Sequence, residues 1–182
     1  FSSLDILSEH LSDLLANLYA PTKFIVIEGG YMLHKVANDR GGWTYAGIAR
    51  NSWPAWPGWE FIDRNEVPPT SMVREFYRTE FWDKMRGNEI SNQDVANTIF
   101  NFGVNAGMGM AVKLAQLVVG ATPDGGIGAK TVERLNQIPD GQRFKEQYAL
   151  AKIARYVEIC NKNPVQVKFL KGWLNRTLKG LK

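Results

Sequence analysis

The sequence predicts a mainly α protein of the α+β class, with a small irregular or β lobe and a helical C-terminal lobe. After Pro69 apolar residues recur every three or four positions, which is typical of amphipathic helices. Between Tyr31 and Pro69 glycines and prolines accompany four of the six tryptophans, without a helical period. The 182 residues are 45% hydrophobic and 22% charged, which is an ordinary globular composition.

The N-terminal segment predicts one amphipathic helix. Its leucines step by three and four residues, and the pattern stops at Pro21, which ends a helix. The leucines are Leu4, Leu7, Leu11, Leu14 and Leu18. We expect residues 1–22 to form a helix that packs on the body. The next segment, residues 24–27, is rich in β-branched residues and fits a strand or a helix.

The segment from Tyr31 to Pro69 is predicted to be loop-like, with one small hairpin over residues 43–49. A loop of this length inside a compact domain is usually functional or contains short strands. Its tryptophans have two interpretations, because indole rings stack on sugars but more often fill a core. Trp43 is the tryptophan that we expect to contact a substrate.

Helices follow from about residue 70 to the C-terminus. Ser91 and Asp94 resemble a capping box for a helix that runs to about Val104. A glycine-rich turn over residues 122–126 separates the later helices. Their predicted ranges are 108–119 closed by Gly120, 130–136, a long helix opened by Asp140 and ending near Lys162, and a last helix starting at Pro164.

The composition excludes several chemistries. One cysteine permits no internal disulfide and no cysteine-based zinc site, and we expect Cys160 to be a small buried residue. Two histidines, His10 and His34, are few for a zinc or Ser-His-Asp hydrolase. We therefore expect neither a metal nor a cofactor. No apolar run is long enough to span a membrane, and the acidic N-terminal segment does not resemble a secretory signal.

Glu28 is the strongest candidate for acid catalysis. It follows an apolar segment, and partial desolvation there would raise its pKa and keep it protonated. Two glycines after it would let a substrate approach the backbone. Asp39 precedes a glycine-rich segment and could face Glu28 across a cleft, as glycoside hydrolysis requires. Alternatively, Glu28 is a surface charge and Asp39 an ordinary turn residue.

Five motifs in order make the chain similar to glycoside hydrolase family 108, a family of lysozyme-like N-acetylmuramidases that includes proteins described as secretion activators. The first two are Glu28-Gly29-Gly30-Tyr31 and Asp39-Arg40-Gly41-Gly42-x-Thr44-x-x-Gly47-Ile48. The third runs from Ile99 through Asn101 to Gly107. The last two are Asp124-Gly125-Gly126-Ile127-Gly128-x-Lys130-Thr131, which is similar to the family's predicted peptidoglycan region, and Gly172-Trp173-Leu174-Asn175-Arg176.

This resemblance implies a lysozyme-like fold and cleavage of the β-1,4 bond between N-acetylmuramic acid and N-acetylglucosamine. It implies that Glu28 is the general acid, that Asp39 stabilises the transition state or acts as base, and that Thr44 positions water. Residues 23–107 would form the catalytic region, and residues 108–182 a helical, peptidoglycan-associated region of the same unit. Candidate substrate-binding residues are Tyr31, Trp43, Tyr45, Asn101 and Asn105.

An alternative function is a catalytically weak wall-binding protein that assists secretion or lysis. Asn101 stands where the resemblance implies an Asp, and the stretch after Tyr31 is unusual for the family. Asn105, in a helix interior, is expected to hydrogen-bond either substrate or the backbone of the small lobe. Asn101 and the stretch after Tyr31 both bear on how strongly the chain catalyses the reaction.

The charge of the chain is uneven. Residues 142–182 contain ten Lys and Arg against two Glu, a net charge of +8, while the whole chain carries only +4. This segment is expected to attract an anionic wall or to form the solvated faces of two closing helices. The expected partner is the peptidoglycan glycan strand, with no specific nucleic acid and a monomeric state. The expected place of action is the cell wall or periplasm, reached after export or lysis.

Overall fold

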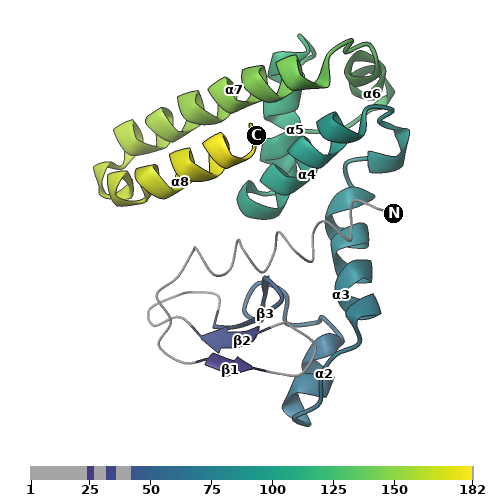
Figure 1. The fold of residues 1–182 in the computed structure, drawn as a ribbon, viewed down its shortest axis with the longest axis vertical. Coiled ribbons are helices and arrows are strands. Elements are labelled where there is room, and N and C mark those ends of the chain that lie inside the picture. The colour runs from purple at the N-terminus through teal and green to yellow at the C-terminus, as the bar shows by residue number, and fades with distance from the viewer. Residues whose placement is uncertain (1–23, 27–31, 36–41, 182) are drawn as a thin grey trace. The chain divides into compact units, whose positions relative to one another are not determined.

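The computed structural model describes residues 24–26, 32–35 and 42–181. The predicted N-terminal helix over residues 1–22 lies outside the described residues, and so do Glu28, Tyr31 and Asp39. Elsewhere the predicted fold class is confirmed, because helices dominate the chain after a small sheet (Figure 1). The chain divides into two compact units between Tyr77 and Arg78. The predicted boundaries at residues 22 and 107 stay predictions.

The first unit contains a four-stranded antiparallel sheet in the order β1-β2-β3-β4. Its strands are β1 (Phe24–Val26), β2 (Met32–Lys35), β3 (Trp43–Tyr45) and β4 (Ile48–Ala49). The expected hairpin over residues 43–49 is confirmed, and the ambiguous segment at 24–26 is a strand. The prediction of loop from Tyr31 was wrong at β2, since Leu33 pairs with Tyr45 and completes the sheet between the two hairpins.

Two helices follow the sheet in the first unit. Helix α2 (Gly58–Asp63) lies inside the segment predicted as loop, and α3 (Thr70–Tyr77) begins after two prolines. The short α2 was missed because its apolar residues, Trp59 among them, lie too close together to show a period. Pro57 precedes α2, where its missing N–H costs no hydrogen bond.

The second unit begins with a π-helical turn, η1 (Arg78–Trp82), and a 3-10 turn, η2 (Gly87–Glu89). Helix α4 (Gln93–Ala106) follows, and its cap is Asn92 rather than the predicted Ser91. The Asn92 Oδ1 accepts hydrogen bonds from the backbone N–H groups of Asp94 at 3.0 Å and Val95 at 3.2 Å. Ser91 instead donates its backbone N–H to the Asn136 side chain at 2.8 Å.

The predicted ends of the next helices are confirmed. Helix α5 (Met108–Val118) is closed by Gly120 in the left-handed region, at φ +67°. The N–H groups of Gly120 and Ala121 then return to the carbonyls of Leu117 and Gln116, which is a Schellman motif. Helix α6 (Ala129–Asn136) occupies the range predicted for the short helix.

The last two helices form an antiparallel pair (Figure 1). Helix α7 (Gly141–Lys162) is capped by Asp140, as predicted, whose Oδ1 accepts from the N–H groups of Gln142 and Arg143. A 3-10 turn, η3 (Pro164–Gln166), leads into α8 (Val167–Lys179). Tyr156 of α7 stacks on Trp173 of α8 with ring centroids 5.1 Å apart, and this contact helps to hold the pair together. Cys160 is buried in α7, as expected.

None of the described helices combines the length and the apolar character that a membrane span needs.

One charged side chain of the second unit is largely buried. The Lys152 Nζ lies over two aromatic rings, 5.7 Å from the Phe102 centroid and 5.6 Å from the Tyr148 centroid. Burial lowers the pKa of Lys152 to about 8, since desolvation disfavours the ammonium. The ring faces attract the cation, but they replace its hydration only in part.

We expect Lys152 to make the stability of the second unit depend on pH. Between pH 8 and 10 the unfolded chain holds the Lys152 proton more tightly than the folded chain, so the free energy of unfolding should rise with pH. The Lys152→Met variant should lose this rise and unfold at a higher denaturant concentration than the wild type at pH 7. Denaturant unfolding followed by circular dichroism measures both effects.

The matched control is Lys130→Met, which removes an exposed lysine of α6 and should keep the rise. The measurement stays below pH 10, because burial raises the pKa of Tyr148 and reverses the trend above that pH. If the free energy of unfolding of Lys152→Met rose with pH as steeply as that of the wild type, Lys152 would not be the cause of the rise.

Candidate active site

The described candidate residues fall into two groups. Trp43, Thr44 and Tyr45 form strand β3 in the first unit, and Asn101 and Asn105 lie on α4 in the second unit. The structure therefore places Trp43, Thr44 and Tyr45 side by side. The roles predicted for all five residues stay predictions.

The candidate carboxylates belong by sequence to two different connections between strands. The β1–β2 connection leaves the sheet where Val26 pairs with Met32. The β2–β3 connection leaves it at the other end of β2, where Lys35 pairs with Trp43. Glu28 belongs by sequence to the first connection and Asp39 to the second. In sequence the two candidate carboxylates therefore stand before and after β2, and both lie outside the described residues.

Alternation along β3 sends its side chains to opposite faces of the sheet. Trp43 and Tyr45 share one face, and Thr44 lies on the other. Tyr45 is fully buried, and its ring stacks on Trp56 with centroids 6.0 Å apart. Thr44 is 8% exposed, and Trp43 is half-buried. The Tyr45 ring therefore supports β3 from within the lobe, whatever contact it makes with substrate.

A tight turn joins β3 to β4. Its central residues, Ala46 and Gly47, both have positive φ, at +49° and +79°, as in the type I′ turns that fit the twist of a hairpin. A left-handed alanine is unfavourable by itself. The Ala46 carbonyl accepts a buried hydrogen bond of 2.7 Å from the Tyr77 hydroxyl of α3. This bond fixes the turn two residues after Thr44.

Aromatic rings fill the space beside the sheet. Trp56 meets Trp59 edge to face at 5.3 Å, and Trp53 meets Phe76 in the same way at 4.9 Å. The Trp59 indole N–H donates to the Trp53 carbonyl at 2.8 Å. Trp56 and Trp59 are buried, which agrees with the core interpretation of these tryptophans.

Arg50 and Asp63 form a link that the sequence analysis missed. Two hydrogen bonds of 2.6 and 2.7 Å join the Arg50 guanidinium to the Asp63 carboxylate, and the guanidinium lies 5.2 Å from the Trp59 ring centroid. The hydrogen bonds lower the pKa of Asp63 and raise that of Arg50. The pair ties the end of β4 to α2. Thirteen residues separate the partners without any motif, so no sequence signal could have found them.

Asn101 and Asn105 are exposed and one turn apart on α4. The Asn105 Nδ2 donates to the Asn101 backbone carbonyl at 2.8 Å. Asn105 therefore bonds the backbone of its own helix. The sequence analysis expected it to bond either substrate or the backbone of the small lobe. The Asn101 side chain remains accessible at the surface of the second unit.

The glycine-rich motif at residues 124–128 folds around one buried amide. The Gln116 Nε2 donates to the Asp124 Oδ1 at 2.8 Å, the Gly126 carbonyl at 2.9 Å and the Thr131 hydroxyl at 3.2 Å. Its Oε1 accepts from the Gly125 N–H at 2.8 Å. Gln116 lowers the pKa of Asp124, and so does the Gly126 N–H. These bonds fix the loop between α5 and α6.

Position 125 requires glycine for two reasons, its backbone conformation and the lack of room for a Cβ. Its φ is +81°, and a Cβ at this position would come within 2.8 Å of the Gly109 carbonyl oxygen. The loop therefore lies directly against the start of α5. Among the described residues, no group of three His, Cys, Asp or Glu side chains is placed to hold a metal ion.

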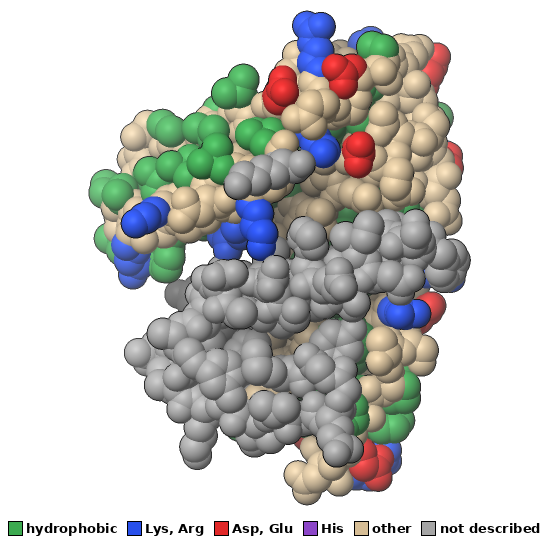
Figure 2. All heavy atoms as spheres, in the orientation of Figure 1, with side chains coloured by type: hydrophobic (Ala, Val, Ile, Leu, Met, Phe, Trp, Pro, Cys, Tyr) green, Lys and Arg blue, Asp and Glu red, His purple; other side chains and the backbone are tan. Residues whose placement is uncertain are grey.

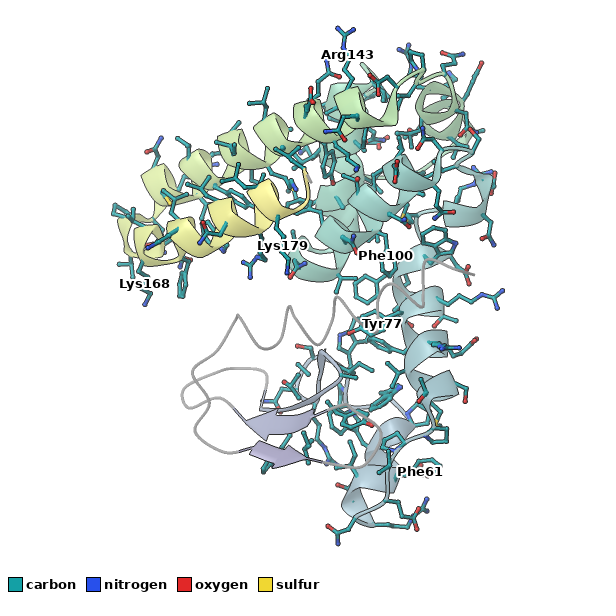
Figure 3. The ribbon with its side chains drawn as sticks, in the orientation of Figure 1. Phe61, Tyr77, Phe100, Arg143, Lys168 and Lys179 are labelled. Carbon is teal, nitrogen blue, oxygen red and sulfur yellow. The ribbon has the colours of Figure 1, made fainter. Side chains whose placement is uncertain are left out.

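We expect the Tyr77→Phe substitution to loosen the β3–β4 turn. It leaves a buried carbonyl without its donor, which costs about 1–3 kcal/mol. Amide hydrogen exchange at Tyr45 and Ile48 should speed up. Figure 3 shows Tyr77 at the end of α3, on the side of the sheet.

A matched control is Tyr148→Phe, which removes the same kind of bond, from the Tyr148 hydroxyl to the Ala111 carbonyl at 2.9 Å, in the second unit. It should lower the stability of that unit and leave exchange at Tyr45 and Ile48 unchanged. Equal exchange of these amides in wild type and Tyr77→Phe would show that the turn holds without the bond.

Comparison with known proteins places these features in a family. Residues 22–107 match the family model described as glycosyl hydrolase 108, and residues 110–178 match the one described as predicted peptidoglycan domain. The first match takes in the whole sheet, α2, α3 and α4, and the second takes in the Gln116 loop and α7.

A solved structure described as that of Brucella abortus SagA is similar over 99% of this chain and 92% of its own, with a TM-score of 0.70 and 25% sequence identity. No curated protein sequence matches the chain. The two family matches together support a glycosidase of a peptidoglycan hydrolase family. Residues 22–107 therefore form a glycosyl hydrolase 108 region, and residues 110–178 form a predicted peptidoglycan domain behind it.

Proposed function

We propose that the chain is an N-acetylmuramidase that cleaves the β-1,4 bond between N-acetylmuramic acid and N-acetylglucosamine. The observation that carries this proposal is the glycosyl hydrolase match over residues 22–107, together with the carboxylate motifs at Glu28 and Asp39 inside it. The predicted peptidoglycan domain behind it makes the glycan strand of the cell wall the natural substrate. The wall or periplasm is the proposed place of action, and a monomer the proposed state.

Glu28 is the proposed general acid. Its carboxyl group would protonate the glycosidic oxygen as the bond to the muramic acid breaks. Its place in sequence between an apolar strand and two glycines supports this role. A desolvated carboxyl group keeps its proton near neutral pH, and the glycines allow the sugar to come close.

Asp39 and Thr44 are proposed to act on the other side of the sugar. Asp39 would stabilise the oxocarbenium-like transition state or act as base, and the Thr44 hydroxyl would position the attacking water. The fixed hairpin supports the role of Thr44, because the Tyr77 bond to Ala46 holds the turn next to it. A separation of about 5–5.5 Å between the two carboxyl groups would favour retention, and about 6.5–9.5 Å inversion.

Tyr31, Trp43, Tyr45, Asn101 and Asn105 are the proposed substrate contacts. The partial exposure of Trp43 and the exposure of both asparagines suit contact with a glycan. Tyr45 is buried, so we assign it the additional role of holding β3 in place beneath Thr44. Sugar hydroxyls would pair with the amides, and an indole face would stack on a sugar ring.

Replacing Glu28 by Gln tests the general acid. The amide cannot deliver a proton, so release of reducing ends from purified peptidoglycan should fall by about 10²–10⁴. Muropeptides released by the wild type should carry N-acetylmuramic acid at the new reducing end, as mass spectrometry after borohydride reduction shows. The matched control is Glu60→Gln, at an exposed position of α2, which should keep full activity.

The second candidate function is a wall-binding protein with weak catalysis. Asn101 favours it, because a neutral, exposed amide stands where the resemblance implies a carboxylate. Wild-type protein that sediments with purified sacculi but releases reducing ends no faster than Glu28→Gln would support this function and overturn the first. Restored or increased release by Asn101→Asp would show that the missing carboxylate limits catalysis.

Thr44 offers a second test of the proposed site. Thr44→Val keeps the shape of the buried side chain but removes its hydroxyl, so kcat should fall on the order of 10²-fold if water loses its position. Thr44→Ser keeps the hydroxyl and should retain most of the activity. Thermal unfolding should differ little between the two variants, which separates catalysis from folding. Full activity of Thr44→Val would remove this residue from the mechanism.

A further inference from the structure

The end of the α7–α8 pair exposes apolar side chains in a short stretch of chain. Val165 of η3 is 64% exposed, and Val167 and Phe169 at the start of α8 are 53% and 47% exposed. Pro164 starts this segment and fixes the sharp reversal between the two helices. We call Val165, Val167 and Phe169 the apolar tip. Three large apolar side chains within five residues of one turn are costly to leave in water.

The same part of the chain is purely basic. From Ile159 to Lys182 the sequence contains no Asp or Glu, and its basic residues are Lys162, Lys168, Lys171, Arg176, Lys179 and Lys182. The Lys168 Nζ lies 4.9 Å from the Phe169 ring centroid, so charge and apolar surface adjoin at the tip. Lys162 pairs with Glu158 of the preceding turn at 2.5 Å. Figure 3 places Lys168 where the two helices meet.

Helix α8 has one side that packs in the unit and one exposed side, and the exposed side carries lysines together with Leu178, which is 57% exposed. Trp173, Leu174 and buried Thr177 lie on the side that packs in the unit, where Trp173 stacks on Tyr156. Lys168, Lys171 and Lys179 lie on the exposed side. Figure 2 shows hydrophobic side chains and Lys or Arg side chains next to one another at the end of this helix pair. Phe169 joins the apolar tip to the lysines, because its ring lies 6.1 Å from that of Trp173 on one side and 4.9 Å from the Lys168 Nζ on the other.

We propose that the apolar tip and the lysines beside it form a docking surface for an anionic phospholipid bilayer. Apolar side chains of an interfacial segment enter the boundary between head groups and acyl chains, while lysines pair with the phosphates. Val165 and Val167 offer neither a flat ring for a sugar nor a hydrogen bond, and the Lys168 Nζ already lies over the Phe169 ring, 4.9 Å from its centroid, which favours lipid over glycan. The net charge of +8 over residues 142–182 complements an anionic surface.

This inference is independent of the proposed catalysis. A lipid-docked chain would work next to the membrane, and its activity on soluble glycan fragments would not need the tip. The docking surface is peripheral, since the tip is a helix reversal of a few residues and not a spanning segment.

The test is sedimentation of the full chain with vesicles. One set is phosphatidylcholine alone, and in the other set part of the phosphatidylcholine is replaced by phosphatidylglycerol. We expect binding to the anionic vesicles only, weakened by added salt. Val165→Ser combined with Val167→Ser should weaken binding about fivefold or more, because it removes the apolar contribution. Lys171→Gln should weaken it by a similar factor.

Two matched variants serve as controls. Leu117→Ser replaces another exposed aliphatic residue, 54% exposed on α5, and Lys130→Gln replaces an exposed lysine on α6. Both should bind anionic vesicles as the wild type does. All variants should keep the wild-type circular dichroism melting curve and the activity on soluble glycan fragments. Equal binding to both vesicle types, insensitivity to salt, or wild-type binding by the Val165/Val167 variant would overturn the proposal.

Discussion

Buried hydrogen bonds from tyrosine and glutamine side chains to backbone groups hold the loops and turns of both units in place. With one cysteine the chain has no internal disulfide, so packing and hydrogen bonding must do this alone. Tyr77 donates to Ala46 in the first unit, and Tyr148 donates to Ala111 in the second. The first bond satisfies a turn carbonyl that burial would otherwise leave without a donor, and the second ties α7 to α5.

The same constraint applies to one hairpin and one loop that carry the motifs found in the sequence. In the first unit, the left-handed Ala46 is tolerated because Tyr77 satisfies its carbonyl and the Tyr45–Trp56 stack supports the strand. In the second unit, the amide of Gln116 satisfies three acceptors and one donor in the loop over residues 124–128. Each hairpin or loop is thereby presented in one conformation, which is what a binding or catalytic surface needs.

Three charged features of the structure have different effects, because each lies in different surroundings. The Arg50–Asp63 pair is exposed, yet its two hydrogen bonds and its position over Trp59 fix the end of β4 to α2. Lys152 is half-buried over two rings, and desolvation lowers its pKa to about 8. The basic face of α8 is different again, because basic residues spaced along a segment without carboxylates act at a distance on an anionic surface that the chain approaches.

Local chemistry let the sequence predict most of the helix ends in the second unit. Asp140 caps α7 and Gly120 closes α5, because a short acceptor side chain and a residue without Cβ satisfy helix ends through their own neighbours. The motifs around Glu28, Thr44 and Asp124 likewise indicated the glycosyl hydrolase family, since each is contiguous in the chain.

Only the tertiary structure decided the features that join distant residues. Ser91 has the right type for a cap, but it bonds Asn136 while Asn92 takes the cap, and a partner 45 residues away leaves no local trace. Strand β2 forms because two neighbours offer it hydrogen bonds, and Tyr45 is buried because Trp56 covers it. Sequence patterns indicate interactions between residues that are close in the chain. Burial and strand pairing instead depend on which distant segments come into contact.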